Sequence, residues 1–260
     1  MMIKVKVNGP TGTIILDRAE RCNALSREMV EQLAQALDDL RQEKRVRGIV
    51  LTGAGPHFCS GVDLKELQES GASDAPETLS QWFSDASQLQ ALFEQMLQLP
   101  KPIIAAVDGA AWGSGFGLVL ASDLVVASQR STFAVPAPRL GLVAGLLAPL
   151  LYFRIGASLA SSVLIGGSEL SAPEAKDLGF VHHVVPSDHI WVRASGWVES
   201  LAAGAAESIQ LTKKLLNETV GEQMTTWMAN GAAATATSLT TEAATEGLKA
   251  FVEKRAPKFP

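Results

Sequence analysis

The sequence predicts an α/β fold in which short strands alternate with helices, followed by a C-terminal region made almost wholly of helices. Two observations predict it. Three short apolar runs, at residues 48–52, 103–107 and 124–127, are separated by segments whose apolar residues recur at helical spacing. After about residue 140 the apolar pattern is helical nearly throughout. Alternation of this kind indicates parallel βαβ units in one sheet.

The N-terminal segment predicts two strands and a capped helix. Residues 3–7 and 13–16 are apolar or alternating on either side of the turn residues Asn8-Gly9-Pro10. Ser26 then stands where a helix N-cap is expected. The apolar residues that follow it at helical spacing are Met29, Val30, Leu33, Leu37 and Leu40. Residues 48–52 form the next strand, and a glycine-bearing loop at residues 53–61 follows it.

The middle of the chain predicts further helices and strands. Residues 63–67 resemble the first turns of a helix, and the polar, Ala/Ser-rich residues 68–78 predict a mobile loop. One apolar face over residues 79–96 predicts a long helix, which Pro100 and Pro102 end. A strand at residues 103–107, a glycine-rich segment, an apolar helix at 116–121 and a strand at 124–127 come next.

The C-terminal half predicts helices and no internal repeat. The candidate helices are residues 145–165, 172–178, 188–203, 206–220 and 223–255. The simplest division of the chain is a β/α core over residues 1–195 and a helical region over residues 196–260.

Composition indicates a cytoplasmic enzyme. With 260 residues, of which 47% are hydrophobic and 19% charged, the chain can bury one large core. A net charge of −5 gives no reason to expect nucleic acid as a partner. Cys22 and Cys59 form no disulfide framework and match no metal spacing, so both are expected to be buried thiols. We expect no signal peptide, and no membrane partner because the longest apolar stretch, residues 140–153, is shorter than the ~20 residues of a membrane span.

Two glycine-bearing loops are the candidate binding elements. Residues 57–64 and 108–117 each follow a buried strand and lead into a helix. Such a place offers unpaired N–H groups and a partial positive charge, and glycine lets a ligand approach the backbone. The second loop is not a dinucleotide motif, because Leu118 stands where the last glycine belongs, and it has no phosphate-loop lysine. Tight helix–strand packing remains an alternative explanation of its glycines.

Several further motifs stand in order along the chain beside these loops. They are Leu16-Asp17-Arg18, Asn23-Ala24-Leu25, Lys101-Pro102-Ile103, Ser122-Asp123, Arg139-Leu140-Gly141, Ala172-Pro173-Glu174-Ala175 and Phe251-Val252-Glu253-Lys254-Arg255. Together with the two loops, they resemble the crotonase (enoyl-CoA hydratase/isomerase) superfamily over nearly the whole chain. The resemblance implies a crotonase-like ββα spiral core with a helical C-terminal trimerisation region. It also implies a homotrimer or a hexamer.

The resemblance implies an acyl-CoA site with a backbone oxyanion hole. The N–H groups of Val62 and Ser114 would bind the thioester oxygen as negative charge develops on it. Coenzyme A would enter as part of the substrate, with no permanently bound cofactor. The residues expected to bind the substrate and its coenzyme A are Arg21, Cys22, Ala24, Ser60, Gly61, Val62, Asp63, Leu64, Gly113, Ser114, Phe251 and Lys254. Phe251 and Lys254 would come from a neighbouring subunit, although Lys254 also fits a solvated terminal lysine.

The expected catalytic carboxylates are missing. Hydratases of this family use two glutamates, and the matching positions here are Gly117 and Ala137. A further acid that some family isomerases carry would fall near Gly145. Because positioned acids and bases contribute typically 10²–10⁴-fold each, two-glutamate hydration is not expected, and a double-bond shift is doubtful for the same reason. Decarboxylation of a β-carboxyl thioester is compatible with what remains, since carbon dioxide leaves without a base.

Few other groups could replace these acids. Asp63 fits a helix N-cap, Asp108 a structural turn and Arg139 a structural role. Asp85 and Gln88 lie on the helix that could cover the acyl pocket, where a solvated face is favoured over an inward direction. The aromatic stripe of Trp82, Phe83 and Phe93 is expected in the core, with part of it lining the acyl site by family analogy. The four histidines, at positions 57, 182, 183 and 189, have no metal-ligand spacing, so no metal site is expected.

The leading hypothesis is an acyl-CoA-binding lyase or isomerase of the hydratase/isomerase superfamily, with a role in fatty acid metabolism, that stabilises a thioester enolate. Three alternatives stay open. One is a decarboxylase or other lyase that relies on the oxyanion hole alone. Another is a catalytically silent acyl-CoA-binding subunit. The third is action on an acyl thioester of a carrier protein.

Overall fold

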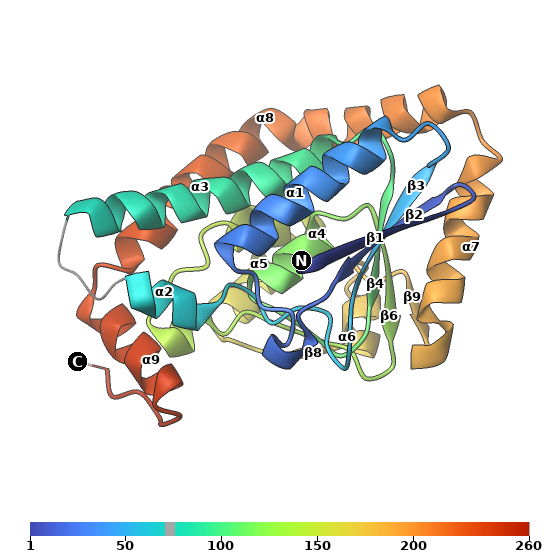
Figure 1. Cartoon of the computed structure of the whole chain (residues 1–260). Helices are drawn as coiled ribbons and strands as arrows, with labels where there is room; N and C mark the ends of the chain where they lie inside the picture. Colours follow the sequence, from blue (N-terminus) through green and yellow to red (C-terminus); the bar gives the residue numbers. More distant parts are fainter. Residues whose placement is uncertain (71–75, 260) are drawn as a thin grey trace.

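The computed structural model describes residues 1–70 and 76–259 (Figure 1). The predicted loop at residues 68–78 is largely wrong, because residues 68–70 end helix α2 (Leu64–Ser70) and residues 76–78 begin helix α3 (Pro76–Gln98). The remainder of that predicted loop lies outside the described residues.

The main sheet has six strands in the order β1-β2-β3-β4-β6-β9. β1 (Ile3–Asn8) and β2 (Thr11–Leu16) form an antiparallel hairpin around the predicted turn. From β2 onward the neighbours are parallel: β3 (Gly48–Gly53), β4 (Ile103–Val107), β6 (Leu124–Ser128) and β9 (His183–Val185). The predicted parallel βαβ units are therefore confirmed. β9 lies in the half predicted as helical, and its three residues are specified by pairing with β6 more than by any local pattern.

A second, smaller sheet was not predicted. It consists of β5 (Ala110–Trp112), β7 (Thr132–Ala134) and β8 (Leu170–Ser171), with β5 parallel to β7 and β7 antiparallel to β8. Strands of two or three residues are too short to show a period of two in the sequence. The small sheet matters for function because β5 lies within the second glycine loop, residues 108–117, and is followed by Gly113 and α4.

The helices enclose the sheet. α1 (Arg27–Gln42) begins after Ser26, whose Oγ accepts a hydrogen bond from the Met29 N–H, so the predicted N-cap is confirmed. The remaining helices are α4 (Ser114–Leu120), α5 (Leu147–Leu164), α6 (Ala172–Asp177), α7 (Ile190–Ala202), α8 (Ala206–Ser238) and α9 (Glu242–Val252), with short 3-10 turns such as η2 (Ala137–Leu140). Figure 1 shows α3 and α8 lying side by side along one long edge of the molecule.

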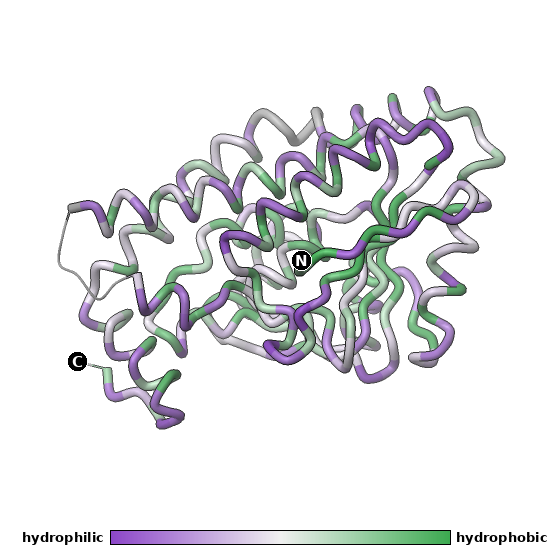
Figure 2. The backbone as a smooth tube through the Cα atoms, viewed as in Figure 1, coloured by the Kyte–Doolittle hydropathy of each residue, from purple (hydrophilic) through white to green (hydrophobic). Residues whose placement is uncertain are grey.

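The central strands of the sheet are buried on both faces. Ile49, Leu51 and Ile103 belong to the large core that α1, α3 and α4 cover. The alternate residues Val50 and Ile104 point to the opposite face and pack under α7. Figure 2 shows the resulting concentration of hydrophobic residues along the central strands. The predicted division at residue 195 falls inside α7, the helix that covers this second face.

Helix α5 passes a simple test for a membrane span. Among the described residues it is the one helix that is long and apolar enough to cross a membrane, and 33% of its residues are buried in the protein. The core helix of a soluble protein passes the same test, and Gly156 interrupts α5 with φ 76° and ψ 167°. Length and composition alone therefore assign no membrane to this helix.

Candidate active site

The two glycine loops lie side by side at the ends of their strands. Cys59 and Ala111 form a parallel bridge, in which the Trp112 N–H donates to the Cys59 carbonyl oxygen at 2.9 Å. Gly61 (φ +102°) follows on one segment, and a Cβ added to it would lie 3.0 Å from the Trp112 oxygen and 3.2 Å from the Ser114 nitrogen. Glycine is therefore required at position 61 for the segments to approach this closely.

The N–H groups of Val62 and Ser114 are both left without an acceptor among the described residues. Val62 forms a parallel bridge with Leu25, in which the hydrogen bonds use Gly61 O and the Asp63 N–H. The amide of Val62 itself therefore points away from that pairing. Ser114 is the first residue of α4, where an N–H has no intrahelical acceptor. The bridges thus bring two unpaired amides onto neighbouring segments.

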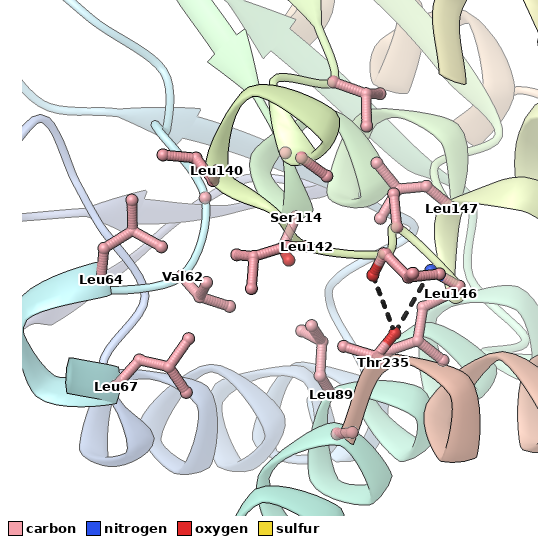
Figure 3. Close-up of a pocket in the computed structure, with 18 of the residues that line it drawn as sticks. Val62, Leu64, Leu67, Leu89, Ser114, Leu140, Leu142, Leu146, Leu147 and Thr235 are labelled. Atoms are coloured by element: carbon pink, nitrogen blue, oxygen red, sulfur yellow. Dashed lines mark hydrogen bonds between the residues drawn. The ribbon is translucent and has the colours of Figure 1, made fainter. Parts of the chain in front are cut away.

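A cavity of about 160 Å³ opens beside these loops (Figure 3). Its wall comes from the two loops, α2, α3, the segment from Val135 to Leu147, and the end of α8. In Figure 3 the side chains of Val62, Leu89 and Leu142 point toward a common space. Among the other lining residues are Leu64, Leu67, Trp82, Asp85, Ala86, Pro136, Ala137, Leu140, Leu146 and Thr235. The candidate site is therefore largely apolar.

The three positions where the resemblance places acids, two by analogy with hydratases and one with isomerases, hold no carboxylate, and two of them have no room for a side chain. Gly117 lies in α4, and a Cβ added there would lie 2.5 Å from Cζ of Phe93, so the phenyl ring fills that space. A Cβ at Gly145 would lie 2.1 Å from the Gly231 carbonyl oxygen of α8. Ala137, in contrast, is half-buried and lines the cavity.

Asp85 is the one ionisable side chain among the described residues that line this cavity. Its two carboxylate oxygens accept hydrogen bonds from Nε and Nη2 of Arg27, both at 2.7 Å, and Gln81 donates a further bond. The hydrogen bond with Asp85 raises the pKa of Arg27. The prediction that Asp85 lies on a solvated face is therefore wrong, because its side chain forms a partly buried ion pair with Arg27 on the cavity wall. Gln88 is exposed and lines a smaller neighbouring cavity of about 60 Å³.

Three other polar candidates have structural roles, as predicted. Asp63 caps α2 by accepting hydrogen bonds from the backbone of Lys65 and Glu66, and it pairs with Arg18 at 2.6 Å. Burial acts to raise the pKa of Asp63, but these bonds hold it below its usual value. Asp108 binds Arg130 and Ser187, while Arg139 is exposed and donates to the Gly167 carbonyl oxygen.

The three aromatic residues of the predicted stripe on α3 lie in different environments. Phe93 is fully buried, as expected, and Trp82 lines the cavity. Phe83 is 51% exposed, so its expected place in the core is wrong. The described residues contain no group of three or more His, Cys, Asp or Glu side chains that could hold a metal ion.

The structure brings most of the expected substrate-binding residues together. Ser60, Gly61, Val62, Leu64, Gly113 and Ser114 line the main cavity, and Asp63 lines the smaller one. The segment from Arg21 to Ala24 runs beside the first loop, where the Ser60 N–H donates to the Cys22 carbonyl oxygen at 3.0 Å. Cys22 is exposed, so a buried thiol is wrong there, whereas burial raises the pKa of Cys59 to about 12.

Two expected residues lie apart from the cavity, and one lining residue and one supporting residue were not predicted. Phe251 and Lys254 are exposed at the end of α9 and do not line the cavity of this chain. Thr235 of α8 was missed, although its Oγ accepts from the Gly145 N–H at 3.2 Å and fixes the loop before α5 (Figure 3). The sequence analysis assigned Asn23 no role beyond its motif. Its buried side-chain amide donates to the carbonyl oxygens of Ala54 and His57 and so supports the first loop. No local sequence pattern reveals contacts over such separations.

Comparison with known proteins agrees with this fold. The family model for enoyl-CoA hydratase/isomerase matches residues 8–260. A relative from Thermus thermophilus, provisionally named an enoyl-CoA hydratase, is 36% identical over 258 residues, covering 99% of this chain and 100% of the relative. The 1,2-epoxyphenylacetyl-CoA isomerase of Escherichia coli is 30% identical and covers 95% of this chain and 94% of its own.

A solved structure shows the same architecture. The enoyl-CoA hydratase/isomerase of Pseudoalteromonas atlantica superimposes with a TM-score of 0.86 at 28% identity, with 100% of both chains covered. The α/β core and helical C-terminal region therefore form a crotonase fold. The chain belongs to the enoyl-CoA hydratase/isomerase family, and is an acyl-CoA enzyme of that kind.

Proposed function

We propose that the chain binds an acyl-CoA thioester and stabilises its enolate with the N–H groups of Val62 and Ser114. One observation carries the proposal: two amides without acceptors among the described residues lie on paired segments beside an apolar cavity. Donors fixed by the backbone need no reorganisation as charge develops on the thioester oxygen, and losing one typically costs on the order of 3 kcal/mol of barrier.

Coenzyme A is part of the proposed substrate, with no permanently bound cofactor. Its adenine and pantetheine would lie along Arg21–Ala24 and Ser60–Leu64, which a backbone hydrogen bond holds side by side. Phe251 and Lys254 would complete the nucleotide site of a neighbouring subunit in a trimer or hexamer. Their exposed places at the end of α9 leave them available for that role.

The proposed reaction is not two-glutamate hydration. Gly117 and Ala137 supply no acid or base, and Asp85 is engaged by Arg27 at both oxygens. This absence of a free carboxylate on the described wall favours decarboxylation of a β-carboxyl thioester as the second candidate. The C–C bond breaks, its electron pair passes into the enolate, carbon dioxide leaves, and a solvent proton restores the α-carbon.

The decisive test compares Ser114→Pro with Ser114→Ala. Proline is tolerated at the first position of a helix but has no N–H, whereas alanine keeps the donor. We expect Ser114→Pro to lower kcat by about 10²–10³-fold and Ser114→Ala to leave it nearly unchanged. Equal activity of a folded Ser114→Pro variant would refute the oxyanion role.

The substrate panel for this test separates the reactions. Crotonyl-CoA reports hydration, a 3-enoyl-CoA reports isomerisation and a malonyl-type thioester reports decarboxylation. Rapid hydration of crotonyl-CoA would refute the inference from the missing acids. Binding with no turnover on any of these would favour a silent subunit, and binding of a thioester carrier protein but not of coenzyme A esters would favour the carrier alternative.

A further inference from the structure

We propose that the acyl group beyond the reacting carbons is neutral, apolar and about the size of a benzene ring or a six-carbon chain. This inference rests on the proposed function and specifies its substrate. Six leucines supply much of the wall: Leu67, Leu89, Leu140, Leu142, Leu146 and Leu147. They come from three separate segments of the chain, namely α2, α3 and residues 140–147, so the apolar surface lies on more than one side of the space.

The size of the cavity sets the size of the group. Its volume is about 160 Å³. An engineered cavity of about 150 Å³ in another protein binds benzene, which gives the scale. The wall cannot easily widen at Gly145, because the backbone there packs directly on Gly231 of α8. A longer chain would have to displace α8 at this place.

Two polar side chains on the wall, those of Asp85 and Thr235, have their hydrogen-bond partners within the protein. The carboxylate of Asp85 is held by Arg27 and Gln81. Arg27 lines the smaller cavity and not this one, so the described wall presents no cation to a ligand. The Thr235 hydroxyl accepts from the Gly145 N–H and has carbonyl oxygens at 2.9 and 3.2 Å to which it can donate.

A charged acyl tail would therefore be poorly accommodated. A terminal carboxylate would be desolvated beside Asp85 without a cation of its own. The indole Nε1 of Trp82 is buried and has no acceptor among the described residues. One N–H can bond a neutral oxygen, but it does not compensate a full charge next to a carboxylate.

The test is a binding series with the full-length wild-type protein. Isothermal titration calorimetry would compare acetyl-, hexanoyl-, phenylacetyl-, lauroyl- and adipoyl-CoA, saturated at the reacting carbons. We expect hexanoyl- and phenylacetyl-CoA to bind at least tenfold more tightly than acetyl-CoA, and lauroyl-CoA to gain nothing further. Adipoyl-CoA, which matches hexanoyl-CoA in length, should bind at least tenfold more weakly than hexanoyl-CoA.

The outcomes separate this inference from the function on which it rests. If no thioester binds, the proposed function is wrong. If all five bind equally, or if adipoyl- or lauroyl-CoA binds most tightly, acyl-CoA binding stands and the inference about the acyl group is overturned.

A pair of variants locates the effect in the cavity. Ala137→Leu adds three carbons to the half-buried wall, whereas Ala157→Leu makes the same change on an exposed part of α5. Ala137→Leu should lower the affinity for hexanoyl-CoA at least tenfold and leave that for acetyl-CoA within threefold. Ala157→Leu should change neither, and equal effects of the two substitutions would count against the cavity as the acyl site.

Discussion

Ser114 and Gly117 lie one turn apart on α4, yet the structure treats the two positions differently. At Ser114, the amide has no acceptor among the described residues and lies beside the cavity. At Gly117, the Phe93 ring of α3 fills the place where a side chain would project. The first position keeps a backbone donor beside the cavity, as the proposed oxyanion hole requires, whereas the second position is filled by packing.

This contrast teaches that binding and proton transfer depend on different parts of the sequence. Backbone donors tolerate many side chains, so the loops can keep their function while nearby residues change. A general acid requires one residue type with room for its side chain. Because the Phe93 ring fills the space beside Gly117, an acid could stand at position 117 only if the packing of α3 on α4 changed.

The largest expected effect is the destabilisation caused by Gly117→Glu. The added Cβ would lie 2.5 Å from Phe93, and the carboxylate would be buried without a partner. We expect a loss of about 3 kcal/mol or more in the free energy of unfolding, measured by urea denaturation. Unchanged stability would show that Phe93 moves aside freely.

Two alanine variants provide the matched control for this steric argument. Alanine in a helix interior is ordinarily more stable than glycine by about 1 kcal/mol. Gly196→Ala on the exposed face of α7 should show that gain, because nothing lies within 4 Å of the added Cβ. Gly117→Ala should show a loss instead. A gain at both positions would contradict the role assigned to the Phe93 ring.

A double-mutant cycle between positions 93 and 117 should give the next largest effect. Phe93→Ala alone should cost about 3–5 kcal/mol, because it leaves a cavity in the core. In the Phe93→Ala background, however, Gly117→Ala should cost less than it does alone, with a coupling energy of about 0.5–3 kcal/mol. Additive effects in thermal and urea unfolding would mean that the two residues do not compete for space.

The sequence predicted the parts of the fold that have strong local patterns. The parallel strands at residues 48–52, 103–107 and 124–127 were recognisable because each is an apolar run with loops on both sides. β8 and β9 were missed because two or three residues carry no period, and only pairing with distant strands defines them. Similarly, α8 was predicted as two helices, while the structure has one from Ala206 to Ser238.

The candidate site was predictable where the backbone forms it, and less so where side chains from distant segments meet. The glycine spacing and the family resemblance located the loops that carry Val62 and Ser114. The sequence also showed that Gly117 has no carboxylate, but not that Phe93 occupies the space. Asp85 was placed on the correct helix, but its direction depended on Arg27, 58 residues away along the chain.

A smaller effect is expected at Asp63, which follows the first loop and caps α2. Asp63→Ala removes the cap of α2 and the partner of Arg18, and should cost about 1 kcal/mol at pH 7. The pKa of Asp63 is lowered in the folded protein, so its charge stabilises the fold above the unfolded pKa of about 4. The stability difference between wild type and Asp63→Ala should therefore shrink as the pH falls below about 4. A difference that is independent of pH would exclude the charge as its cause.

The smallest expected change in stability is that of Ala137→Glu, which introduces an acid at a position that, unlike Gly117, has space for a side chain. Ala137 is half-buried and lines the cavity, so a longer side chain there enters open space. In Gly117→Glu, by contrast, the added side chain meets the Phe93 ring. We expect the free energy of unfolding to change by no more than about 1 kcal/mol. Hydration of crotonyl-CoA should stay at the wild-type level, because one acid without its partner at position 117 cannot both activate water and deliver a proton. Substantial hydration by Ala137→Glu would mean that a proton donor already exists in the wall, and Asp85 would then be the first residue to substitute.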